Sequence, residues 1–320
     1  MRHIILISIL LGNAWAFIHA QQPEVRVRYE RNEDRKFQFY ASSTTYAPVT
    51  LFLTFTKLEG TREFSIGMPK TYLLQYGEND LFTLRPDQEN ASISFAYKTS
   101  WRIGNMTEVP DTDFVYLSPI TPGKKVMANP MVSLKKYLNN KMKKGEKEDT
   151  NRPTGLTIKT QEGDTIYAIR SGIVGKIQDN SASQGNGRAF DRNENFVEIY
   201  HKDGSEAKYK LFKDHGIFVS EGDIVVAGQP IGIIGGENYE HGSHLRLILS
   251  GWFRPQKGDP ERDIYNNKIY RIFIPVFCLP DNETCRPTAL TRFVSVHPEA
   301  VIMQEMSKRE KKKYLKGKSK

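Results

Sequence analysis

The stretches EGDTI at residues 162–166 and EGDIV at residues 221–225 decide the fold, because each places a Gly-Asp turn directly before an apolar strand. Each is followed by a glycine-bearing segment, GIVG at 172–175 and GQPIG at 228–232. Glycine is favoured where a turn needs positive φ or where strands approach closely. The repeated order of turn, strand and glycine segment indicates an internal repeat, so we expect a β-unit built from two related halves.

Short apolar stretches separated by polar turns continue on both sides of this repeat and predict an all-β protein. Within residues 153–275, strands are expected at 156–159, 165–169, 172–178, 196–201, 206–212, 224–226, 229–235 and 244–249. Residues 22–120 begin with the alternating stretch VRVRY and predict an immunoglobulin-like β-sandwich, with turns at 59–60, 76–80 and 85–87.

The segments between and after these two units complete the predicted organisation. Residues 121–152 are interpreted as a Lys-rich linker with a short helix at 133–144, and residues 276–307 as further strands with the cysteine pair. The tail at 308–320 contains eight Lys or Arg and one Glu, which is +7 of the formal net charge of +9. We expect a disordered, solvated tail, with contact to anionic envelope polymers or lipid headgroups as the alternative.

Residues 1–20 have the pattern of a secretory signal peptide. A basic start is followed by an apolar run at 4–11 and by small residues at Ala14, Ala16 and Ala20. A membrane anchor is the alternative, but a span needs about 20 apolar residues, and this run is shorter. We therefore expect export to the periplasm or surface of a bacterial envelope. Nucleic-acid binding is not expected, since no motif for it occurs.

Cys278 and Cys285 are the two cysteines of the chain. In an oxidising compartment, a pair so close in sequence predicts a disulfide. A metal site is the alternative, but two thiols without a nearby His supply too few ligands.

The repeat and its surroundings resemble the β-core of the LytM/lysostaphin-like zinc endopeptidases of bacterial cell walls. The resemblance covers residues 155–250, including EIYHKDG at 198–204 and HL at 244–245, in matching order and spacing. It implies the duplicated hybrid motif fold. The succession of signal peptide, sandwich and this core also resembles exported family members from Bacteroidetes-type bacteria.

The resemblance implies zinc ligands at positions that carry other residues here. The family's ligand Asp falls on Thr157, and its last ligand His, the second of an H-x-H, falls on Arg246. The upstream ligand His has no counterpart, because no His occurs between His19 and His201. Of the two further family histidines, one falls on Leu211, in the stretch that begins at Tyr209, and the other is His244. We expect no bound metal, because Arg is permanently cationic. At contact range and intermediate dielectric, Coulomb's law gives a repulsion between Arg and Zn²⁺ on the order of several kcal/mol.

Three functional hypotheses remain open from the sequence. In the first, a vestigial cleft binds a peptidoglycan stem peptide, and Arg246 binds the carboxylate of that peptide. The cleft is formed by Tyr209, Leu211, His244, Arg246 and Thr157. In the second, the domain binds an envelope protein, as the resemblance to metal-free relatives implies. The third is an active zinc endopeptidase with a rebuilt metal site, for which the candidate ligands are His201, Asp203, His215 and His241. A purely structural role, with Arg246 an ordinary paired charge, is the remaining alternative.

Overall fold

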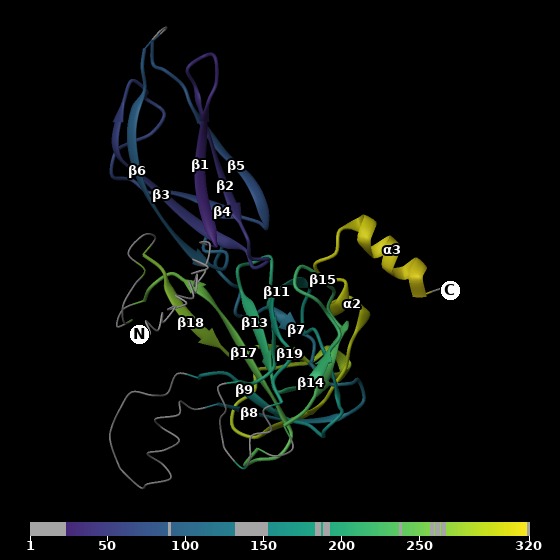
Figure 1. Cartoon of the computed structure of the whole chain (residues 1–320). Coiled ribbons are helices and arrows are strands. Elements are labelled where there is room, and N and C mark those ends of the chain that lie inside the picture. Colours follow the sequence, from purple (N-terminus) through teal and green to yellow (C-terminus); the bar gives the residue numbers. More distant parts are fainter. Residues whose placement is uncertain are drawn as a thin grey trace, which may run out of the picture.

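The computed structural model describes residues 24–88, 91–131, 153–182, 187, 193–236, 239–256, 259, 263 and 267–318. The predicted signal peptide and the predicted helix at 133–144 lie outside the described residues. The all-β prediction is confirmed, with strands accounting for most of the regular structure (Figure 1). No helix among the described residues is long and apolar enough to cross a bilayer.

The N-terminal unit contains two three-stranded antiparallel sheets. One sheet has the order β1-β2-β5 (Val25–Arg31, Phe37–Ser43, Gly77–Leu84), and the other β4-β3-β6 (Lys70–Leu74, Val49–Glu59, Ser94–Ile103). Buried clusters draw on both sheets; in one of them Phe39 of β2 meets Phe55 of β3 edge to face, with ring centroids 6.1 Å apart. The immunoglobulin-like assignment stays a prediction. The prediction of a turn at 76–80 is wrong in part, because residues 77–80 begin β5 and pair with β2.

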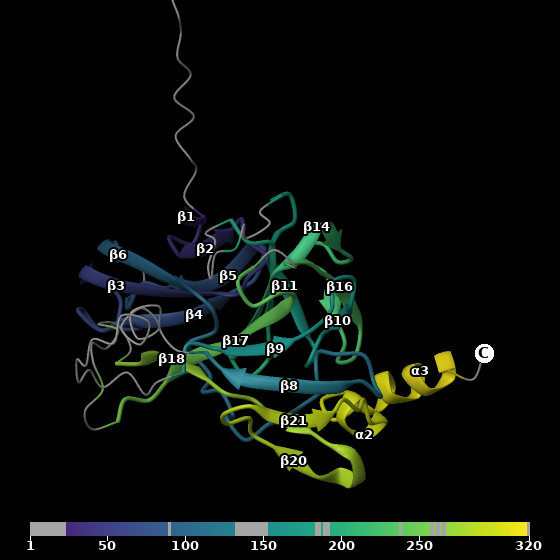
Figure 2. The same cartoon turned by 90° about the horizontal axis from the view of Figure 1, so that it is seen from below.

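A nine-stranded sheet forms the main body of the C-terminal unit. Its order is β15-β11-β12-β13-β17-β9-β8-β21, with β18 also pairing with β17 (Figure 2). The bounds are Ile224–Val225, Gly172–Gln178, Phe196–Tyr200, Glu206–Lys210, His244–Phe253, Leu156–Lys159, Lys125–Pro130, Thr291–Val294 and, for β18, Ile269–Phe273. Strand β8 corrects the predicted linker: residues 125–130 pair with β9 and β21 instead of connecting two domains loosely.

The predicted duplication is visible in the hydrogen bonds of the two Gly-Asp turns. The Asp164 carboxylate accepts from Gln161 N at 2.9 Å, and Asp223 accepts from Ser220 N at 2.8 Å. Both preceding glycines have positive φ, 84° and 92°. Each turn then docks on the other half: Gly163 N donates to Ile234 O, whereas Gly222 N donates to Val174 O. The halves therefore interlock and contribute to one core.

Two small sheets complete the fold. Strands β10 (Thr165–Tyr167), β16 (Pro230–Ile234) and β14 (Phe212–Ile217) form one, and β20 (Thr284–Cys285), β19 (Val276–Cys278) and β7 (Val115–Tyr116) form the other. A 3₁₀ turn (Pro280–Asn282) connects β19 to β20, and helices α2 (Glu299–Ile302) and α3 (Lys308–Lys318) end the chain. The tail was expected to be disordered; its described part is helical.

The predicted disulfide is not formed in the structure, in which both cysteines are free. Cys278 lies opposite Thr284, and Cys285 lies opposite Phe277. Successive residues of a strand point to opposite faces, so the two thiols lie on opposite sides of this ladder. The Sγ of Cys278 instead lies 3.6 Å from Val296 O, and burial raises the pKa of this thiol to about 11.

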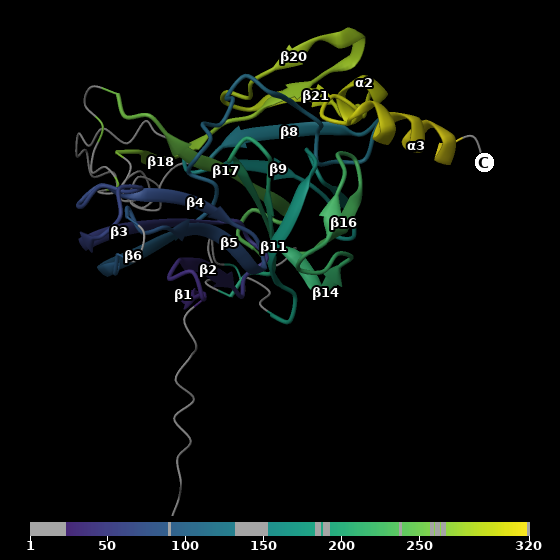
Figure 3. The same ribbon diagram turned by 90° about the horizontal axis from the view of Figure 1, so that it is seen from above.

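The N-terminal unit lies against the C-terminal unit (Figure 3). Nζ of Lys268 donates to the carbonyls of Met106 and Glu108, both at 2.6 Å. Gly204 has φ 83°, and a Cβ added there would lie 2.6 Å from Asn105 O. This contact leaves no room for a side chain at the turn between β12 and β13.

We predict that Gly204→Ala destabilises the protein more than Gly123→Ala. Both glycines have positive φ, which costs an alanine about 1 kcal/mol, but Gly123 has no atom within 4 Å of an added Cβ. Only Gly204→Ala adds a clash with the backbone of the other unit. Urea unfolding of the two variants measures the difference, and equal losses would contradict the tight junction.

Candidate functional site

The two positions at which the family's zinc ligands are expected are neighbours across the central strands. Arg246 on β17 lies opposite Thr157 on β9 and opposite Lys210 on β13. Paired residues share a face of the sheet, so these three side chains leave the sheet on one side. His244 lies two residues before Arg246 and therefore shares that side. Thr157, His244 and Arg246 therefore share one side of the sheet.

Arg246 is held by a buried carboxylate that the sequence analysis did not identify. Nη1 of Arg246 lies 2.5 Å from Oε1 of Glu194, and Nζ of Lys210 lies 2.5 Å from Oε2 of the same carboxylate. The Glu194 side chain is 0% exposed and the Arg246 side chain 5%. Tyr239 covers the guanidinium with its ring, whose centroid is 5.2 Å from Cζ. We call Glu194, Lys210, Tyr239, His244 and Arg246 the Glu194 cluster.

His244 joins the cluster as a neutral hydrogen-bond acceptor. Its Nδ1 lies 2.6 Å from Gly242 O, and its Nε2 lies 3.1 Å from Nε of Arg246. The carbonyl can only accept, so Nδ1 carries the proton and Nε2 accepts from Arg246. Burial, with a further contribution from the Arg246 charge, lowers the pKa of His244. Both ring nitrogens are therefore engaged within the protein.

The structure does not place Tyr209 in this cluster. Tyr209 lies opposite Leu247, one residue out of step with Arg246, so its side chain enters the core on the other face. It is fully buried, and its hydroxyl accepts from Ile169 N at 3.0 Å. Leu211 is 3% exposed and belongs to the same core. The prediction that both residues line one cleft with Arg246 is wrong for Tyr209.

Leu211 also ends the strand that was expected to continue to residue 212. It has φ 80°, a left-handed conformation that is rare for a branched side chain. Its amide donates to Asn195 O, and its carbonyl accepts from Gly235 N. The chain therefore leaves the large sheet at this residue and enters β14 of a different sheet.

The donor set does not fit zinc. A catalytic zinc site needs three ligands with free lone pairs and one open position. Arg246 has no lone pair to offer, Thr157 carries no charge, and Nε2 of His244 is occupied by Arg246. The guanidinium itself supplies the positive charge beside Glu194. Among the described residues, no group of three or more His, Cys, Asp or Glu is arranged to hold a metal ion.

The other candidate ligands for a rebuilt metal site have separate surroundings. His201 is buried and its Nδ1 lies 2.9 Å from Ser171 O, while Asp203 binds Arg170 at 2.7 Å and Ser205. His215 is on the surface with φ 52°. These side chains do not converge on one point in the part of the chain that the structure describes.

Comparison with known proteins identifies the domain that carries this site. Residues 151–254 match the model of peptidase family M23. Residues 151–254 form an M23-type peptidase domain. No curated protein matched the chain. The domain assignment agrees with the duplicated, interlocked β-fold described above.

Solved structures similar to the chain include two peptidase catalytic domains and one longer protein. A catalytic-domain variant of the prophage-encoded M23 protein EnpA from Enterococcus faecalis is 22% identical, with 42% of this chain and 87% of that chain covered and a TM-score of 0.30. The lysostaphin catalytic domain from Staphylococcus simulans is 22% identical, with coverages of 42% and 85% and a TM-score of 0.25. Helicobacter pylori Csd3 is 12% identical, with coverages of 91% and 83% and a TM-score of 0.29.

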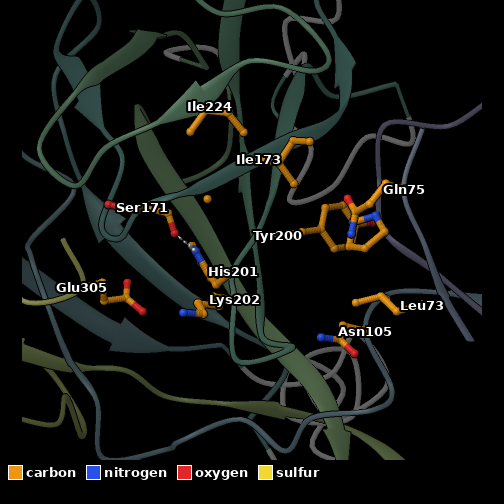
Figure 4. Close-up of a pocket in the computed structure, with 12 residues that line it drawn as sticks. Leu73, Gln75, Asn105, Ser171, Ile173, Tyr200, His201, Lys202, Ile224 and Glu305 are labelled. Carbon is orange, nitrogen blue, oxygen red and sulfur yellow. Dashed lines mark hydrogen bonds between the residues drawn. The ribbon is translucent and has the colours of Figure 1, made fainter. Parts of the chain in front are cut away.

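A pocket of about 400 Å³ lies where the N-terminal unit meets the M23 domain (Figure 4). Leu73 and Asn105 line it from one side, and Ile173, His201 and Ile224 from the other. Ile224 is 73% exposed, so an apolar side chain faces solvent at the edge of the pocket. This pocket could not be predicted from the sequence, because its walls come from segments far apart in the chain.

Arg170 connects three segments of the chain. It is 4% exposed and binds Asp203 at 2.7 Å and Glu305 at 2.6 Å. Its Cζ lies 3.6 Å from the ring centroid of Phe114. The guanidinium therefore fixes the strand connection before β7 and the segment after α2 to the M23 domain.

We predict that the stability of the folded protein depends on the single carboxylate of the Glu194 cluster. Glu194→Gln leaves Arg246 and Lys210 without their anion, and breaking a buried pair in this way costs about 3–5 kcal/mol. The matched control is Glu59→Gln, because Glu59 forms an exposed pair with Lys57 at 3.4 Å. Such surface pairs contribute about 0–1 kcal/mol. Chemical unfolding at neutral pH measures both, and a loss below 1 kcal/mol for Glu194→Gln would contradict the assignment.

A second prediction concerns the pH dependence of stability. Burial, and then the Arg170 charge, lowers the pKa of His201 from 6.5 to about 4. Between these values the unfolded chain binds a proton that the folded chain does not, so stability is full above pH 6.5 and falls as the pH drops toward 4. The full effect is about 3 kcal/mol. Between pH 7 and pH 5, the free energy of unfolding should fall less in His201→Gln than in the unsubstituted chain. Equal losses would contradict the assignment of this pH dependence to His201.

Proposed function

We propose that this chain is a non-catalytic M23-type protein that acts by binding a partner at the bacterial envelope. The observation that carries the proposal is the Glu194–Arg246 pair at the former ligand position. Zinc in such a site lowers the pKa of a bound water and polarises the scissile carbonyl. A guanidinium that is already saturated by Glu194 and His244 offers neither an open coordination position nor a metal-bound water.

The cluster also argues against Arg246 as a clamp for a peptide carboxylate. Both oxygens of Glu194 are engaged, one by Arg246 and one by Lys210. An incoming carboxylate would have to displace a buried anion and leave it uncompensated, at a cost of several kcal/mol, about the 3–5 kcal/mol of a broken buried pair. The partner is therefore bound elsewhere on the protein.

The pocket between the N-terminal unit and the M23 domain, here called the junction pocket, is the surface that best supports a protein or peptide partner. Its exposed Ile224, together with Ile173 and Leu73, presents apolar surface beside the polar Lys202. Exposed apolar patches with polar rims are typical of interaction sites. Export to the envelope remains part of the proposal, supported by the signal-peptide pattern of residues 1–20.

The test is a zinc measurement on purified protein after incubation with excess zinc and desalting. We expect no stoichiometric zinc in the unsubstituted chain. The variant Arg246→His removes the guanidinium and leaves His244 and Glu194 beside a new imidazole, so it should retain more zinc. Stoichiometric zinc in the unsubstituted chain, or peptidoglycan hydrolysis that a chelator abolishes, would overturn the proposal.

A further inference from the structure

The C-terminal helix α3 carries a strong positive charge on an ordered scaffold. Seven of its eleven residues, Lys308–Lys318, are Lys or Arg, and one is Glu. The helix extends outward from the body beyond α2 in all three views (Figures 1, 2 and 3). A charged run of this kind would be expected to be disordered, so the contacts that hold it in place need explanation.

Two sets of contacts fix α3. Ser307 and Glu310 form a reciprocal capping box, in which Ser307 N donates to the Glu310 carboxylate at 2.7 Å and Glu310 N lies 3.3 Å from Ser307 Oγ. Tyr314 packs against a cluster that includes Leu117, Cys278 and Ile302. The one acidic residue of the helix is thus used for capping, and one side of the helix is attached to the body.

The opposite side of α3 is a row of exposed cations. Lys308, Lys312 and Lys316 follow one another at intervals of four residues, which places them on one helical face. All three side chains are exposed, and Glu310, the one acid of the helix, is held by Ser307. Leu315 is 45% exposed and lies beside this row. We call Lys308, Lys312, Leu315 and Lys316 the α3 face.

We propose that the α3 face docks on an anionic lipid bilayer. Charge complementarity favours a surface of phosphates, and the exposed Leu315 flanked by lysines favours an interface that has apolar material just below its headgroups. Lysine stems can lie along such an apolar layer while their ammonium groups stay in water. This docking is independent of the proposed partner at the junction pocket.

The experiment is co-sedimentation of the full chain with vesicles of phosphatidylcholine, with and without phosphatidylglycerol, at low and high salt. Binding is expected only with phosphatidylglycerol and should weaken with salt, because screening shortens the range of surface charges. The triple variant Lys308→Gln, Lys312→Gln, Lys316→Gln should bind on the order of a hundredfold more weakly, since each basic residue strengthens such binding about fivefold. Circular dichroism and thermal unfolding confirm that each variant is folded.

The matched control neutralises three exposed lysines of the N-terminal unit, Lys57, Lys70 and Lys98. It has the same net charge as the triple variant and should bind like the unsubstituted chain. Equal weakening in both triple variants would overturn the proposal, as would binding to neutral vesicles alone. Leu315→Ser should weaken vesicle binding but not binding to soluble polyphosphate. Two results would assign the α3 face to another polyanion and overturn the proposed docking on a bilayer. One is unchanged vesicle binding by Leu315→Ser, and the other is tighter binding of the unsubstituted chain to polyphosphate or duplex DNA than to vesicles.

Discussion

A guanidinium in the middle of a buried sheet must have an anion beside it, because an isolated charge in such a place costs several kcal/mol, about the penalty of one unpaired buried ion. Arg246 meets this requirement through Glu194, which enters from the segment just before β12. The same carboxylate also neutralises Lys210 on the neighbouring strand. The pairing links β17, β13 and the start of β12, so one anion holds together the centre of the M23 domain where a metal would otherwise connect the strands.

The fold was predictable from sequence because its signal is periodic and repeated. Two Gly-Asp turns with the same geometry precede matching strands, and each half contributes a surface that the other half covers. Strand β8 was missed because residues 125–130 were interpreted together with the Lys-rich stretch that follows them. Val126 and Ala128 are buried and alternate with less buried residues, but a strand of six residues gives a weak signal in the sequence.

The site was predicted only where it depended on strand register. Thr157 and Arg246 were expected to meet, and they pair directly across β9 and β17. Tyr209 could have been excluded by the same reasoning, because Lys210 faces Arg246 and adjacent residues of a strand face opposite ways. Glu194 could not be placed in this way, since it precedes its strand and no register fixes its side chain. The one available signal was that a buried arginine requires a carboxylate.

The two positively charged regions of the protein differ in how their charge is balanced. Arg246, Lys210 and Arg170 are buried or half-buried and lie within hydrogen-bonding distance of carboxylates. Their charges are therefore largely neutralised locally. Lys308, Lys312 and Lys316 of α3 are exposed, and the one acid of the helix is engaged in its cap. Residues 308–320 account for +7 of the formal +9, so the long-range field of the chain originates mainly from its last segment. Such a field acts over about 10 Å at 0.1 M salt, far enough to orient this end of the molecule toward an anionic surface before any contact forms.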